Sequence, residues 1–201
     1  MGVTVTSLIG LSAVTVGSVL TSRYAKSESY FQSVQTARSA MTKIQSQFRG
    51  AQLVTQVSPT QVSVWRDLNG DGQVNPSEMV LLTCSGGTIR QYQIVYPVGM
   101  SAATKLILDA STSLSIAVEQ PASTASTIQN GPYSTSKVVA ANVAEFSVSA
   151  DASPPMSRMV TISVTSGQGS DAVTIRSVAA LRGDKTGRVA VVEGHYALAG
   201  S

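Results

Sequence analysis

GVTVTSLIGLSAVTVGSVL, residues 2–20, and FQSVQTARSAMTKIQSQF, residues 31–48, decide the fold of this chain. The first stretch is apolar, with small and hydroxyl side chains mixed in, and no charged residue occurs before Arg23. Its length is about what a helix needs to cross a bilayer. Two other interpretations compete: a buried core helix, or a secretory signal peptide, which would have basic residues in front. An uncharged run this long favours a membrane anchor over residues 1–22. Its small residues, Gly10, Ala13 and Gly17, would allow close contact between helices.

The second stretch has the periodicity of an amphipathic helix. Its apolar residues recur at steps of three and four, which places them on one helix face. No proline interrupts the chain from Met1 to Val57, and Gly50 is a plausible stop. We therefore predict one rod of about fifty residues, roughly 75 Å long at 1.5 Å per residue. Its amphipathic half, residues 23–53, would pack on the following domain through Phe31, Val34, Ala37, Met41, Ile44 and Phe48.

The pattern changes to short Val, Ile and Thr runs over residues 54–183, separated by Gly, Pro, Ser and Asn. MVTISVT, residues 159–165, alternates apolar and polar side chains in the manner of a half-buried strand. We also expect strands at KLILDA, residues 105–110, and SLSIAVEQ, residues 113–120, and a Ser/Thr-rich linker or surface loop at 120–137. A flexible tail is expected at 184–201, in which VAVVEG, residues 189–194, could add an edge strand. The predicted fold class is α+β, with a long N-terminal helix packed on a twisted antiparallel sheet.

Composition argues against several classes of function. Charged residues make up 12% of the chain and the net charge of +3 is scattered, so we expect no nucleic-acid partner. A single cysteine, Cys84, excludes an internal disulfide, and a single histidine, His195, removes a part that zinc sites and Ser-His-Asp triads need. We expect His195 to be a solvated tail residue. The chain is therefore predicted not to be an enzyme.

DLNGDGQVNPSE, residues 67–78, has the spacing of an EF-hand calcium loop. Such a loop places oxygen ligands at positions 1, 3, 5, 7, 9 and 12, and a glycine, here Gly72, at position 6. Val74 matches the apolar residue at position 8. The calcium ligands would be Asp67, Asn69, Asp71, the carbonyl of Gln73, a water near Asn75, and Glu78.

The flanking runs predict strands on both sides of this loop, so a paired helix-loop-helix is not expected. Asn-Gly and Asp-Gly are also strong hairpin-turn signals, and a plain turn is the competing interpretation. If calcium binds, it would hold together three carboxylates that otherwise repel one another. Its role would be structural, because the loop has no neighbouring base or nucleophile.

Three segments resemble the type IV pilin superfamily, and in particular its minor pilins and the J-type and W-type pseudopilins of type II secretion. GVTVTSLIGL, residues 2–11, is similar to the prepilin processing motif. QTARSAMTKIQSQFRGAQLV, residues 35–54, resembles the end of the family's helix. VAANVAEFSVSA at 139–150, MVTISVTSG at 159–167, and a strand ending at Ala180, Leu181 and Arg182 resemble its C-terminal strand order.

The resemblance implies a protein-transport or pilus filament whose subunits wait in the bacterial inner membrane and are then extracted into a periplasmic or extracellular filament. It implies cleavage by a prepilin peptidase after Gly2 and N-methylation of Val3. The family's leaders are basic, whereas only Met1 and Gly2 precede this cut. Ser7 stands where the family usually has a glutamate, which favours a position at the filament tip.

The resemblance implies other pilin-like subunits as partners, through the N-terminal helix. Two hypotheses from other classes compete with the filament subunit. One is a membrane-anchored extracytoplasmic calcium-binding or adhesion module that does not polymerise. The other is a secreted hydrolase, for which the sequence offers no acid-base pair.

Overall fold

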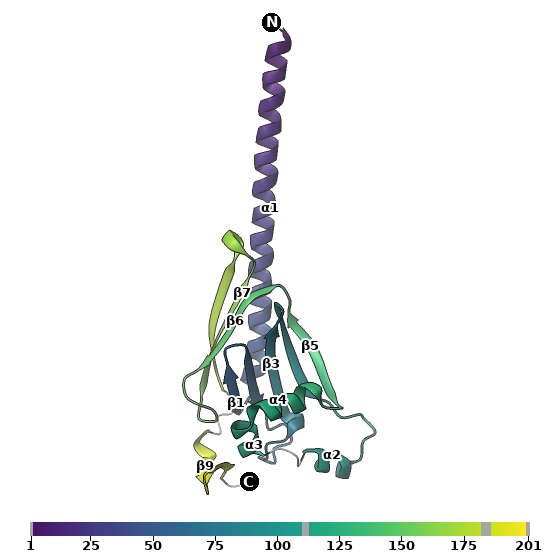
Figure 1. The fold of residues 1–201 in the computed structure, drawn as a ribbon, viewed down its shortest axis with the longest axis vertical. Helices are drawn as coiled ribbons and strands as arrows, with labels where there is room; N and C mark the ends of the chain where they lie inside the picture. Colours follow the sequence, from purple (N-terminus) through teal and green to yellow (C-terminus); the bar gives the residue numbers. More distant parts are fainter. Residues whose placement is uncertain (1, 110–112, 182–185, 200–201) are drawn as a thin grey trace.

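A single long helix dominates the computed structural model, which describes residues 2–109, 113–181 and 186–199, with side chains described from residue 20 onward. Helix α1, Gly2–Arg49, is 48 residues long. Its C-terminal part packs on the β-structure and the rest projects away from the domain (Figure 1). The α+β class, with a helix packed on antiparallel sheets, is confirmed.

The face of α1 that packs on the domain follows only the C-terminal part of the predicted apolar stripe. Ala37, Met41, Ile44 and Phe48 are buried, as predicted. Phe31 is 67% exposed, so its expected contact with the domain is wrong. The physical reason is its direction: at about 100° per residue, Phe31 lies about 120° around the helix from Ala37, whereas Ser33, two residues later, is buried against Gly167.

The larger sheet has five antiparallel strands in the order β1-β2-β3-β4-β5. The core cluster on one side of it includes α1 residues such as Ile44, and the second cluster includes residues of α3 and α4 such as Ile128. Both clusters are buried, so this sheet forms the centre of the domain. Its strands are β1 Leu53–Ser58, β2 Gln61–Trp65, β3 Met79–Ser85, β4 Thr88–Ile94 and β5 Ser134–Ala140.

The smaller sheet has three antiparallel strands in the order β6-β7-β8, Val143–Ala150, Met159–Ser166 and Val173–Ala180. Strand β6 crosses the tips of two hairpins of the larger sheet. Its Val143 N–H donates to Gly87 O at 2.9 Å, and its Val148 N–H donates to Pro59 O at 3.2 Å. Helix α1 contacts β5, β7 and β8, and so bridges the two sheets.

Three predictions for the segment between β4 and β5 are wrong. The runs expected to be strands form helices α2, Ala102–Asp109, and α3, Leu114–Glu119. The expected surface loop contains helix α4, Pro121–Asn130. Short apolar runs do not distinguish a strand from a helix by periodicity, and Leu, Ala and Glu favour the helix. Local caps were available: Ser113 Oγ accepts from Ile116 N–H at 3.3 Å, and Pro121 occupies the first turn of α4.

The segment predicted as a flexible tail contains a short antiparallel hairpin, β9 Val189–Val192 and β10 His195–Leu198. Strand β9 lies in the VAVVEG run that could add a strand, but among the described strands it pairs with β10 and not with the edge of a larger sheet. Leu198 and Tyr196 pack against the second core cluster. The Arg188 guanidinium donates two hydrogen bonds to Ala199 O, at 2.9 and 2.8 Å, which close the hairpin. This part of the chain is therefore joined to the domain by apolar contacts. Three single 3-10 turns complete the described elements: Pro76–Glu78, Gly169–Asp171 and Thr186–Arg188.

In the part of the chain whose side chains the structure describes, no helix is both long and apolar enough to cross a membrane. The expected anchor, residues 1–22, lies mainly before that part. The same holds for the predicted processing and packing residues, which lie outside the described side chains: Gly2, Val3, Ser7, Gly10, Ala13 and Gly17.

Candidate functional site

The loop of residues 67–78 connects β2 to β3, two neighbouring antiparallel strands in which Trp65 lies opposite Met79. The prediction of flanking strands is confirmed. Gly70 and Gly72 have φ of 78° and 72°, a region that side-chain-bearing residues rarely adopt. Val74 is buried in the second core cluster, and this fixes one end of the loop to the domain.

The loop brings three of its carboxylates together. One oxygen each from Asp67, Asp71 and Glu78 lie within 4.8 Å of one another. Asp67 is half-buried, Asp71 is exposed and Glu78 is only 5% exposed. Three carboxylates this close repel one another unless a cation or a proton intervenes. These residues could hold a metal ion.

The other predicted ligands surround Asp71 as hydrogen-bond donors. The side-chain amides of Asn69 and Asn75 donate to Asp71 Oδ2 at 2.8 and 3.5 Å. The backbone N–H of Gln73 donates to Asp71 Oδ1 at 2.7 Å, and the N–H of Asp71 donates to Asn69 Oδ1 at 2.9 Å. The N–H of Gly72 reaches Asp67 Oδ1 at 3.4 Å. The backbone thus holds Asp67 and Asp71 beside each other.

Glu78 accepts three hydrogen bonds from the protein. The indole of Trp65 donates to Glu78 Oε2 at 3.1 Å, and the N–H groups of Leu68 and Asn69 donate to Oε1 at 2.9 and 3.0 Å. Burial raises the pKa of this carboxyl above its ordinary value, against the opposing effect of the three hydrogen bonds. Within the described residues, no Lys or Arg side chain forms an ion pair with Glu78.

The donor set fits a hard divalent cation. All the side-chain oxygens come from carboxylates and amides, which are the ligands that calcium and magnesium take in proteins. A carboxylate oxygen that already accepts a hydrogen bond retains a lone pair for a metal. The site contains neither the thiolate nor the imidazole that zinc sites use.

Asp109 supports the loop from outside, a role that its position in the sequence does not indicate. Its Oδ1 accepts from the N–H of Ser77 at 3.3 Å and from the Tyr96 hydroxyl at 2.9 Å, and its Oδ2 accepts from Ser77 Oγ at 3.0 Å. Ser77 immediately precedes Glu78 in the 3-10 turn. Asp109 therefore fixes the turn that carries the buried ligand. Nothing local could have revealed this, since Asp109 and Ser77 are 32 residues apart in sequence.

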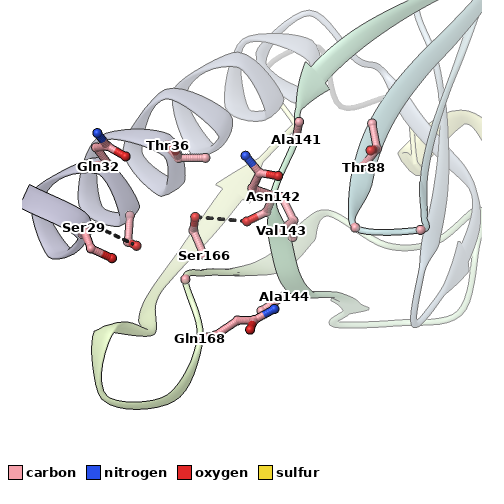
Figure 2. Close-up of a pocket in the computed structure, with 14 residues that line it drawn as sticks. Ser29, Gln32, Thr36, Thr88, Ala141, Asn142, Val143, Ala144, Ser166 and Gln168 are labelled. Atoms are coloured by element: carbon pink, nitrogen blue, oxygen red, sulfur yellow. Dashed lines mark hydrogen bonds between the residues drawn. The ribbon is translucent and has the colours of Figure 1, made fainter. Parts of the chain in front are cut away.

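A groove of about 510 Å³ opens where α1 leaves the domain (Figure 2). Its fourteen lining residues include no charged side chain. Ser33 Oγ donates to Ser29 O at 3.0 Å, and Ser166 Oγ donates to Asn142 O at 3.2 Å, so two of its hydroxyls are already engaged. The groove contains no acid or base that could catalyse a reaction.

A second polar cluster joins α3 to β10. His195 Nδ1 lies 3.0 Å from Glu119 Oε2 and 3.3 Å from Ser115 Oγ. Hydrogen bonds from Ser115 and then His195 lower the pKa of Glu119. Both contacts use the same ring nitrogen, whereas a catalytic triad needs one nitrogen for the acid and the other for the nucleophile. His195 remains exposed, so the cluster holds the hairpin against α3 and lacks the geometry of a triad.

Comparison of the chain with protein families, curated proteins and solved structures found no match.

Proposed function

We propose that this protein is a non-catalytic subunit of a bacterial envelope filament of the type IV pilin class, either a minor pilin or a type II secretion pseudopilin. The observation that carries the proposal is the shape of α1. Its residues 20–32 are all exposed, and only its last turns are covered by the domain. A helix that extends so far from its own core requires partners elsewhere, since most helical stability in proteins comes from packing.

Large side chains on the projecting part support packing with other helices. Tyr24 and Phe31 are 74% and 67% exposed, and Leu20 is 50% exposed. Their spacing of four and seven residues places all three on one helix face. Burying each of them in a helix bundle would contribute about 1.5–3 kcal/mol. The subunit would be cleaved after Gly2 by a prepilin peptidase, stored in the inner membrane, and then moved into the filament.

Cross-linking in a bacterial host tests this function. In a Cys84→Ser background, chains with a single cysteine at Leu20, Tyr24 or Phe31 are treated in intact cells with a bifunctional thiol-amine reagent, and the products are separated by size. The reagent joins each cysteine to an amine of a neighbouring copy, because a heterologous contact does not bring a residue next to its own counterpart. We expect a ladder of multimers.

A monomer under all conditions would instead support a membrane-anchored module that does not polymerise. Mass spectrometry of the mature N-terminus gives an independent result. An N-methylated Val3 supports processing, and an intact Met1 or a cut near Ser22 contradicts the filament proposal.

We further propose that the loop binds calcium through Asp67, Asn69, Asp71, Gln73, Asn75 and Glu78. The supporting observation is Glu78, a carboxylate that is 5% exposed and has no positive partner in the described part of the chain. Burial of an uncompensated charge is costly, and a divalent cation would compensate this carboxylate together with its two neighbours. Calcium outside the cell reaches the millimolar range that suits a weak, structural site of this kind.

The melting temperature with calcium and with chelator tests the metal. At a hundred times the Kd, a ligand that binds only the folded state adds about 2.7 kcal/mol, or roughly 5–11 °C for a domain of this size. We expect Asp71→Asn to abolish most of the shift. The matched control is Glu145→Gln, an exposed carboxyl on β6, which should retain it. An equal melting temperature in calcium and chelator would contradict the calcium site and would leave the filament proposal standing.

A further inference from the structure

Among the described strands of the five-stranded and three-stranded sheets, β5 and β8 each have a free side. Strand β5 is the last strand of the five-stranded sheet, and β8 is the last of the three-stranded sheet. The opposite ends, β1 and β6, contact each other. Among the described strands, none pairs with the outer side of β5 or β8. A free edge presents unpaired N–H and C=O groups that another chain can pair with.

The hydrogen bonds at the start of β5 establish which residues point outward. Val95 N–H donates to Tyr133 O at 3.0 Å, so these two residues form a hydrogen-bonded pair. Bonding alternates along an antiparallel pair. The main-chain groups of Ser136 and Val138 therefore point away from β4, and Val138 is 44% exposed.

The same alternation applies to β8. Leu181 N–H donates to Arg158 O at 3.1 Å across the β7–β8 pair. Because bonded positions alternate, the residues of β8 that hydrogen-bond to β7 are the odd-numbered ones, from Ala179 back to Val173. The main-chain groups of Arg176 and Val178 therefore point outward, and Val178 is 57% exposed.

The two free edges lie on opposite sides of α1. Lys43 Nζ donates to Val139 O at 3.2 Å, at the end of β5. Gln45 donates through its side-chain amide to Ser177 Oγ, in the middle of β8. Two positions along a helix correspond to about 200° of rotation, so these side chains leave α1 in nearly opposite directions. One copy thus presents one free edge on each flank.

The two edges also run in opposite directions along α1. Past the end of β5, Asn142 lines the same groove as Gln32 and Thr36, well before Lys43 in the helix, so β5 runs against α1 (Figure 2). At β8, Gly167 precedes the strand and lies against Ser33, where an added Cβ would be 2.6 Å from Ser33 Oγ. Ser177 lies beside Gln45 further down the helix, so β8 runs with α1.

We propose that β5 of one copy pairs with β8 of the next copy, as an antiparallel extension of the sheet. The inference rests on the proposed filament function in one respect: neighbouring copies must have parallel α1 helices. In that arrangement the two edges meet antiparallel, which is the more stable pairing. Because the surfaces that meet are different, the contact is heterologous and continues from copy to copy as an open array.

The exposed valines favour one register. Placing Val138 opposite Val178 brings two exposed β-branched side chains together as a cross-strand pair. The same register places Lys137 opposite Ala179, away from Arg176, so the two positive charges on these edges do not face each other. Like charges directly opposite would oppose pairing.

Disulfide formation between copies tests the contact. In a Cys84→Ser background, a chain carrying both Val138→Cys and Val178→Cys is oxidised in the host and examined without reductant. Opposite residues of a bonded antiparallel pair have Cα atoms about 5.5 Å apart, within the range of a disulfide. We expect a ladder from the double variant and monomers from each single variant, since a heterologous contact never brings a residue next to itself. The matched control is Lys137→Cys with Val178→Cys, which should give no ladder because a shift of one residue places the side chains on opposite faces.

A proline variant gives a readout independent of cysteine. Ser136→Pro removes an outward N–H, a change that an edge strand tolerates, so the melting temperature should be unchanged while assembly is lost. Persistent assembly of this variant would overturn the proposal.

A dimer from Val138→Cys alone would also overturn the proposal, since such a dimer indicates that β5 pairs with itself. If the double variant stays monomeric while the α1 cysteines still cross-link, the edge pairing is wrong and the filament proposal stands. Loss of both kinds of cross-link would overturn both.

Discussion

Trp65 donates a 3.1 Å hydrogen bond through its indole nitrogen to Oε2 of Glu78, and both side chains are buried. The bond joins the last residue of β2 to the last residue of the loop. It places the only tryptophan of the chain against the most buried carboxylate of the candidate metal site. The loop and the core of the larger sheet are therefore stabilised by the same contact.

Trp65→Phe should lower the free energy of unfolding by about 2–4 kcal/mol, because it removes a hydrogen bond to a charged group and leaves a small cavity. Urea unfolding followed by far-UV circular dichroism measures the change. The control is Tyr24→Phe, at a position that is 74% exposed, which should stay within about 0.5 kcal/mol. A loss below about 0.5 kcal/mol for Trp65→Phe would contradict the buried bond.

The stability of the metal-free protein should depend on pH through Glu78. Burial raises the pKa of this carboxyl above its ordinary value of 4.5, so the folded state retains the proton more strongly than the unfolded state. The stabilisation of the folded state by protonated Glu78 is therefore fully present below about pH 4.5 and is lost as pH rises through the raised pKa. Other groups titrate in the same range, so the informative quantity is the difference in unfolding free energy between the native protein and Glu78→Gln. We expect the native protein to lose stability relative to Glu78→Gln as pH rises. A difference in unfolding free energy that stays constant with pH would contradict the raised pKa.

Ile44→Ala should destabilise the protein by about 2–5 kcal/mol, because Ile44 is fully buried between α1 and the sheets and its truncation leaves a cavity. Thr42→Ala is the matched control two positions away, where the side chain is exposed and the change should be within about 0.5 kcal/mol. Thermal or urea unfolding measures both. Equal stability of the two variants would show that the lower half of α1 does not pack as described.

Phe31→Ser should leave the stability of the isolated protein within about 0.5 kcal/mol, because the side chain makes little contact with its own domain. Assembly should fall, since the substitution removes an apolar group from the projecting face of α1. The amount of multimer after cross-linking in the host measures this effect. Lys26→Ala, on another face of the same exposed segment, should assemble normally. Unchanged assembly of Phe31→Ser would indicate that this face is not a subunit contact.

Local signals in the sequence were sufficient for some elements. The uninterrupted helix and its buried lower stripe follow from periodicity and the absence of proline, and the loop follows from glycine and Asx spacing between two β-type runs. The same rules failed between β4 and β5. There, runs of five to eight residues were assigned to strands, although Ser113 and Pro121 offered helix starts. The prediction for Phe31 failed for a different reason: two successive steps of three residues rotate it about 120° away from Ala37 and the rest of the buried stripe.

The sequence by itself determined the long helix, the antiparallel character of the domain and the ligand spacing of the loop, because each depends on residues within a few positions of one another. The tertiary structure alone decided that Glu78 is buried beneath Trp65, that Asp109 holds Ser77, and that the edges of β5 and β8 lie on opposite sides of α1. These relationships join residues brought together only when the sheets fold around the helix. Burial and electrostatic environment depend on that packing, and periodicity within one segment carries no information about it.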